Sequence, residues 1–114
     1  MLQRLLASFC RIPGVRVASL IEELGSEQIR VSRQDEGEAS LADLSEVLRI
    51  ARVAAEVLGI GEARQCWFEA EAGCIMVCPL PGGMSLAIVT QSKPDLGRLS
   101  HEIQLRENAI SQLL

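Results

Sequence analysis

Residues 64–90 decide the fold and read RQCWFEAEAGCIMVCPLPGGMSLAIVT. Three strand-like runs lie in this stretch: Arg64–Ala70, Cys74–Leu80 and Met84–Thr90. Glu71-Ala72-Gly73 and Pro81-Gly82-Gly83 separate them, and glycine-bearing segments of this length favour hairpin turns. We therefore expect an antiparallel meander. Its second and third strands are apolar on both faces, which is typical of central strands that are covered on both sides.

The first strand of this meander alternates in character. Cys66, Phe68 and Ala70 lie on one side, and Gln65, Trp67 and Glu69 lie on the other. Contact surfaces often carry an amphipathic aromatic residue on a semi-polar face. We interpret Trp67 as an interface residue on this basis, with a place in the core as the alternative.

The rest of the chain predicts three helices and two more strands around the meander. Leu2–Ile12 is a short amphipathic helix, and Val15–Ile21 and Gln28–Ser32 are strands joined by a turn at Leu24-Gly25-Ser26. Gln34–Glu38 reads as a loop, Ser40 as the N-cap of a helix over about Leu41–Leu58, and Pro94 as the start of a last helix. The expected fold class is α/β, in the order α-β-β-α-β-β-β-α. The simplest arrangement is a five-stranded antiparallel sheet with helices on both faces.

The bulk composition suits one domain spanning residues 1–114. Hydrophobic residues make up 48% of the chain but aromatic residues only 3%, so the core must be mostly aliphatic. The mean hydropathy of +0.22 is high for so short a chain, whose surface is proportionally large. We expect part of the apolar surface to contact a partner.

Charge and the N-terminal sequence exclude several classes of function. The net charge is −4 and no basic cluster occurs, so we expect no nucleic-acid partner. Gln3 and Arg4 interrupt the N-terminal apolar run, which is too short for a signal peptide or a membrane span. We therefore expect a cytoplasmic protein.

The sequence offers no convincing reactive centre. The four cysteines lie in apolar surroundings without a CxxC pair, and we predict buried free thiols. His101 is the only histidine and has no nearby ligand set, and no Gly-Lys-Ser/Thr follows Pro81-Gly82-Gly83 as a phosphate-binding loop requires. We predict no catalytic residue, no metal and no cofactor, and hence no enzyme.

The helix predicted over about residues 41–58 carries more apolar surface than one core-facing side needs. One stripe comprises Leu41, Leu44, Leu48, Ala51, Ala55 and Leu58, and a second comprises Val47, Ile50, Val53, Ala54 and Val57. Periodicity does not decide which stripe faces the sheet. The predicted partner or dimer interface comprises Val47, Ile50, Val53, Ala54, Val57 and Trp67.

Five local patterns in the same order resemble the roadblock (dynein light-chain) family, whose members include bacterial regulators of small Ras-like GTPases. They are Ile12-Pro13-Gly14-Val15, Leu58-Gly59-Ile60-Gly61, Gly73-Cys74-Ile75-Met76-Val77-Cys78-Pro79-Leu80, Leu86-Ala87-Ile88-Val89 and Pro94-Asp95-Leu96-Gly97-Arg98-Leu99. The resemblance implies a profilin-like sandwich that dimerises through its middle helix and third strand, with the paired helices exposed as a platform. It implies a homodimeric adaptor or regulator that binds a small Ras-like GTPase. The alternative is a structural subunit of a larger scaffold made with other roadblock-like chains.

Overall fold

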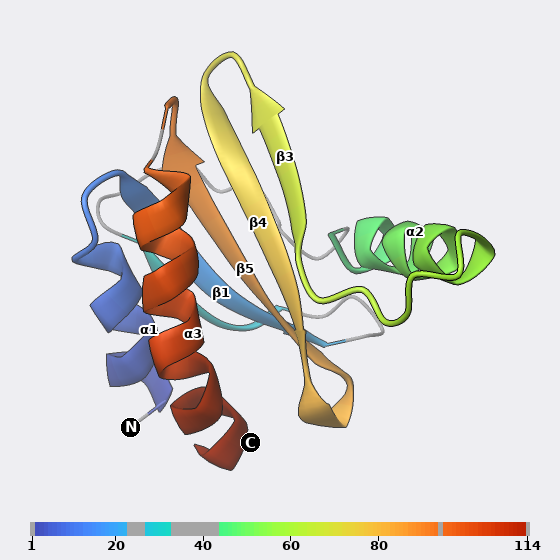
Figure 1. Ribbon diagram of the computed structural model, residues 1–114. Helices are drawn as coiled ribbons and strands as arrows, with labels where there is room; N and C mark the ends of the chain where they lie inside the picture. The colour runs from blue at the N-terminus through green and yellow to red at the C-terminus, as the bar shows by residue number, and fades with distance from the viewer. Residues whose placement is uncertain (1, 23–26, 33–43, 94, 114) are drawn as a thin grey trace.

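Helices and strands follow one another in the order that the sequence predicts (Figure 1). The computed structural model describes residues 2–22, 27–32, 44–93 and 95–113. Its elements are α1 (Leu2–Cys10), β1 (Val15–Glu22), β2 (Glu27–Ser32), α2 (Leu44–Val57), β3 (Cys66–Ala70), β4 (Gly73–Leu80), β5 (Met84–Gln91) and α3 (Leu96–Leu113). The turn predicted at residues 24–26, the loop predicted at residues 34–38, Ser40 and Pro94 lie outside the described residues.

The described strands form one antiparallel sheet in the order β2-β1-β5-β4-β3. The meander of β3, β4 and β5 is confirmed, and β3 lies at one end of the sheet. This end strand begins at Cys66, two residues later than predicted. Cys66 pairs with Val77, so Arg64 falls opposite Pro79, whose missing N–H cannot continue the ladder.

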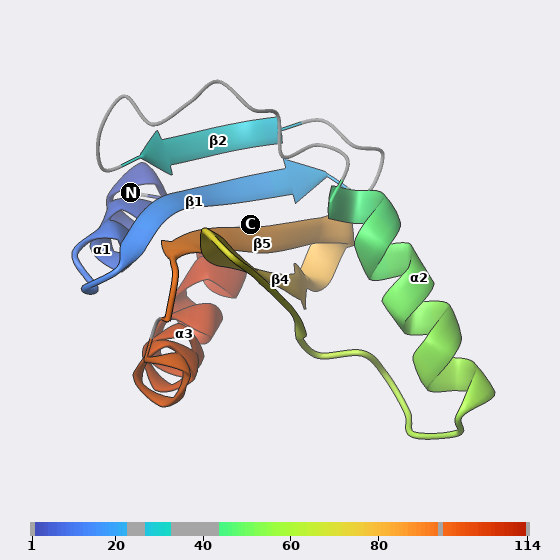
Figure 2. The same ribbon diagram turned by 90° about the horizontal axis from the view of Figure 1, so that it is seen from above.

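Helices α1 and α3 cover one face of the sheet (Figure 2). The core beneath them is mostly aliphatic, as the composition predicts; it includes Leu6, Phe9, Leu20, Met76, Leu86, Ile88, Leu99, Ile103 and Ile110. Burial of this many large side chains supplies the main hydrophobic stabilisation of the fold. The two helices on this face are therefore anchored to the sheet along most of their length.

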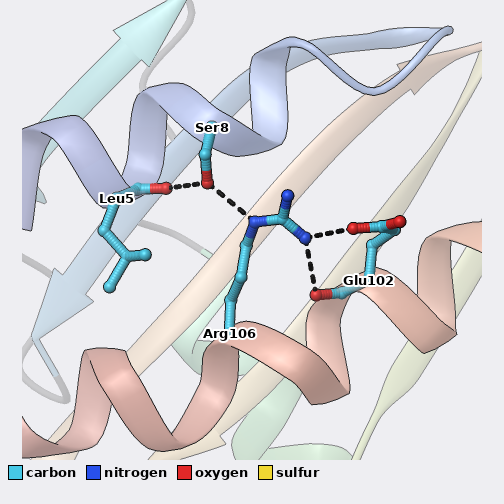
Figure 3. Close-up of polar contacts among 4 residues, drawn as sticks. All are labelled: Leu5, Ser8, Glu102 and Arg106. Atoms are coloured by element: carbon cyan, nitrogen blue, oxygen red, sulfur yellow. Dashed lines mark hydrogen bonds and ion pairs between the residues drawn. The ribbon is translucent and has the colours of Figure 1, made fainter.

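A polar clamp also ties α1 to α3 (Figure 3). Arg106 Nε donates a hydrogen bond of 2.8 Å to Ser8 Oγ, and Ser8 Oγ donates one of 2.5 Å to the Leu5 carbonyl. The guanidinium also pairs with Glu102 and lies 5.4 Å from the centroid of the Phe9 ring. The hydrogen bond from Arg106 lowers the pKa of the Glu102 carboxyl. These contacts fix the relative position of the two helices.

Helix α2 lies on the opposite face, and only part of it touches the sheet. Leu48 and Ala51 pack with Cys66, Ile75 and Val77. Beyond this contact the helix leans away from the strands and extends past β4 (Figure 2). Among the described residues, α2 therefore covers the second face of the sheet only in part.

Candidate protein–protein interface

Helix α2 has two adjoining apolar stripes, and the structure shows which one faces inward. Leu48 and Ala55 are buried and Ala51 is half-buried, so this stripe faces the sheet. The second stripe faces solvent, as its two largest exposures show: Ile50 is 57% exposed and Val57 is 79% exposed. Its other members are Val53 and Ala54, both exposed, and Val47, which is half-buried. The structure thus brings the five predicted α2 residues together on one exposed surface, which we call the α2 stripe.

Charged side chains border the α2 stripe on its other side. Glu46 and Arg49 form an exposed ion pair, and this contact lowers the pKa of the Glu46 carboxyl. Arg52 and Glu56 continue the polar side along the helix. Exposed pairs of this kind contribute little to stability, so the border chiefly keeps this side of the helix in water.

The turn after α2 adds two exposed apolar residues that the predicted interface did not include, and one of them, Leu58, had been placed in the first stripe. Gly59 N–H donates to the Glu56 carbonyl and Ile60 N–H donates to the Ala55 carbonyl, which is the Schellman pattern of helix termination. Gly59 supplies the positive φ of +67° that this turn requires. The turn leaves Leu58 and Ile60 exposed beside the α2 stripe. Gly59 predicted the end of the helix from the sequence, and the same glycine indicates where these two exposed residues lie.

The two aromatic residues of β3 lie on opposite faces. Trp67 is half-buried, packs against the core beneath α1 and α3, and donates from Nε1 to Gln65 Oε1 over 3.1 Å. Phe68 points to the α2 side and is 45% exposed. Phe68 was absent from the predicted interface, although the alternation of β3 had placed it opposite Trp67. The assignment of Trp67 to an interface stays a prediction.

An open hollow of about 1110 Å³ lies between α2, the segment leading to β3, the end of β4 and α3. Its charged lining residues carry both signs; they are Arg52, Glu56, Glu62, Arg64 and Glu107. No described group of three or more His, Cys, Asp or Glu side chains is arranged to hold a metal ion. His101 is exposed on α3 and is not one of the residues that line the hollow. The hollow is therefore lined by charge of both signs.

The four cysteines are free and buried, which confirms the sequence prediction. Burial, followed by the charge of Glu107, raises the pKa of the Cys78 thiol to about 12. Burial also raises the pKa of Cys66 and of Cys74. Thiolates are the nucleophilic form of cysteine, so these three thiols are suppressed as nucleophiles at neutral pH.

None of the helices in the described part of the chain is both long enough and apolar enough to cross a membrane. Helix α2 exposes Ile50, Val53 and Val57 and has charged residues along one side. Its apolar stripe thus has the amphipathic form that suits a protein surface.

The chain has the roadblock/LC7 fold. It superposes on a roadblock/LC7 domain from Streptomyces avermitilis with a TM-score of 0.86 and 20% identity, covering 97% of this chain and 95% of that one. It matches MglB of Myxococcus xanthus with a TM-score of 0.86 and 12% identity, over 98% of this chain and 93% of that one. A structure of MglB with a tetrameric arrangement gives a TM-score of 0.84 at 16% identity, over 97% of this chain and 85% of that one.

The resemblance read from the sequence is confirmed at the level of the fold by these superpositions. No protein-family model matches the chain, and no curated protein sequence matches it. The identities are low, so the shared property is the arrangement of the backbone.

Proposed function

We propose that this protein is a non-enzymatic, cytoplasmic homodimeric adaptor that binds a small Ras-like GTPase through a platform of paired α2 helices. The observation that carries the proposal is the α2 stripe, in which Ile50 and Val57 are 57% and 79% exposed. A soluble domain rarely leaves a contiguous row of large apolar side chains in water. The whole chain acts as a single module, and no cofactor takes part.

The homodimer uses two features of one edge of the molecule. The α2 stripe packs against the α2 stripe of a second copy, and β3, which is an end strand, pairs with the partner's β3. Phe68 lies on the same face as α2, so the second copy's helix covers its exposed ring. The partner's helix thereby completes the third layer, which α2 alone forms only in part. The result is a profilin-like sandwich. The resemblance to the roadblock family supports this mode of association.

The GTPase docks on or beside the paired helices. The roadblock resemblance supports a Ras-like partner, and the apolar platform with a charged border has the character of a protein contact surface. The charged residues near it carry both signs, and no arginine is singled out as a transition-state finger. Any change in GTP hydrolysis would therefore come from repositioning the loops of the GTPase itself.

Affinity capture from a lysate of the source organism tests the GTPase partner. The immobilised protein is incubated with parallel lysate samples that contain a non-hydrolysable GTP analogue or GDP, and bound proteins are identified by mass spectrometry. We expect a Ras-like GTPase to be retained by the wild type and lost with Ile50→Asp. Leu105→Asp is the matched control, because Leu105 is 63% exposed on α3, a different helix. Equal retention by both variants would remove the α2 platform as the docking site.

A second candidate is a structural subunit that pairs with other roadblock-like chains in a scaffold. The tetrameric arrangement of one MglB structure favours it, because that arrangement shows that this fold is compatible with assemblies larger than a dimer. Native mass spectrometry of the isolated chain separates the two candidates. A dimer supports the homodimeric adaptor, and a monomer that associates only with other roadblock-like chains supports the scaffold subunit.

A further inference from the structure

The edge of β3 is the feature from which a more specific arrangement follows. This five-residue strand ends the sheet, and its outer edge has no strand partner among the described residues. Phe68, at its centre, is the exposed large apolar side chain of the strand. We infer that Phe68 lies beside the two-fold axis of the homodimer and faces its own copy across paired β3 strands. The inference rests on the proposed homodimer and adds the register in which the two edges join.

Symmetry limits the registers that two identical strands can adopt. Residues directly opposite each other in an antiparallel pair lie on the same face of the sheet. Both α2 helices of the proposed dimer cover one face, so the axis stands perpendicular to the joined sheet and every residue keeps its face. Each residue then faces one an even number of positions away. The axis must therefore pass midway between one residue and its own copy in the partner. We refer to this as an axis through that residue.

Charge excludes the registers centred toward the end of β3. An axis through Glu69 would set this carboxylate against its own copy, and an axis through Ala70 would set Glu69 against the partner copy's Glu71. Both glutamates are exposed. Like charges directly opposite each other in a ladder are destabilising. The remaining centres are Cys66, Trp67 and Phe68.

Strand length selects among these three. An axis through Phe68 pairs the whole of β3 with itself, whereas an axis through Trp67 pairs only residues 66–68 of the strand with one another. An axis through Cys66 would push most of the pairing into residues 62–65, which are not strand. The Phe68 register therefore forms the most ladder hydrogen bonds at the free edge.

Side-chain size also suits the Phe68 register. On the α2 face it sets Phe68 against Phe68 and flanks this pair with Cys66 opposite Ala70. Two small residues beside each ring leave room for the rings to offset, which aromatic pairs prefer. On the other face Trp67 lies opposite Glu69, so no like charges meet. The aromatic pair would then lie directly beneath the paired α2 stripes.

Disulfide trapping tests the register. The background carries Cys66→Ala and Cys74→Ala, because Cys74 pairs with Glu69 within the chain and would capture a new thiol there. Trp67→Cys, Phe68→Cys and Glu69→Cys are then added one at a time, and cross-linked dimer is measured on a non-reducing gel. Directly opposite residues lie about 4.5 to 5.5 Å apart between Cα atoms, within disulfide range, whereas diagonal neighbours lie roughly 7 Å or more apart.

We expect at least roughly tenfold more cross-linked dimer from Phe68→Cys than from either neighbour, because only the central residue meets its own copy. A mixture of the Trp67→Cys and Glu69→Cys proteins should also cross-link, although neither does so alone. This mixture tests the same register without altering Phe68. Circular dichroism under reducing conditions verifies that each variant is folded.

The outcomes separate the register from the proposed function. Preferential cross-linking of Trp67→Cys or Glu69→Cys, in a protein that sediments as a dimer, overturns the Phe68 register and leaves the homodimer intact. Sedimentation of the wild type as a monomer overturns both. Efficient trapping at Phe68, together with trapping in the mixture, supports the register whether or not a GTPase is found.

Discussion

Replacing Ile50 by aspartate is the most direct perturbation of the α2 stripe, and its effect can be estimated from the structure. Complete burial of an isoleucine side chain stabilises by roughly 1.5–3 kcal/mol. Ile50 is 57% exposed in the protomer, so its burial in a dimer contributes about 0.9–1.7 kcal/mol per copy, and symmetry doubles this. The loss of roughly 1.7–3.4 kcal/mol corresponds to about a 15- to 270-fold weaker dimer. Two desolvated carboxylates would weaken it further.

Sedimentation velocity over a dilution series measures the dimer dissociation constant directly. The folded protomer should tolerate Ile50→Asp, because exposed substitutions usually change the free energy of unfolding by less than about 0.5 kcal/mol. Leu105→Asp provides the control, since it places the same charge at a similarly exposed apolar position on α3. We expect its dissociation constant to match the wild type. An unchanged dissociation constant for Ile50→Asp, or an equal loss in both variants, would refute the assignment of the α2 stripe.

Three further predictions concern the stability of the protomer. Gly73→Ala should lower the melting temperature by an amount equivalent to about 1–3 kcal/mol, because the new Cβ would lie 2.5 Å from a backbone carbonyl of the facing strand; Gly97→Ala, which meets only ordinary contact at 3.7 Å, should be neutral or stabilising. Burial raises the pKa of Cys78 from 9.0 to about 12, so stability should be complete below about pH 9 and fall as the pH rises toward 12, and alkaline denaturation of Cys78→Ala should lack this part of the loss. Ser8→Ala should cost about 1 kcal/mol in urea denaturation by removing the hydrogen bond from Arg106; no loss would mean that the clamp does not hold α1 to α3.

The order of elements was predictable because each boundary carries a local signal. Pro13-Gly14 and Gly59 end their helices, and the glycines at 73 and at 82–83 mark the two hairpins. The meander follows from these turns because antiparallel neighbours need only short connections. The start of β3 was predicted two residues too early, because Pro79 affects the ladder from a different strand. Local patterning carries no information about which residue a strand will meet.

The sequence was sufficient to group the residues of the α2 stripe, but it did not show that this group would be exposed. Helical periodicity separates Leu48, Ala51 and Ala55 from Ile50 and Val57, but both stripes are apolar enough to face a core. The sheet resolves this ambiguity, since only the first stripe can reach Cys66 and Val77. Contacts of this kind join residues more than ten positions apart, and no local pattern determines them.

Phe68 shows why the interface was predicted only in part. The alternation of β3 separates it correctly from Trp67, and the polar neighbours of Trp67 favoured that ring as the exposed one. In the structure, however, the large ring of Trp67 packs against the core, while the α2 face at Phe68 remains open because α2 leans past the end of the sheet. The exposure of Phe68 thus depends on β3 being an end strand, and this position is set by the pairing of β1 with β5. An aromatic residue left open at the free edge of a sheet, beside an unpartnered helix stripe, is therefore better evidence for an interface than the polarity of its immediate neighbours.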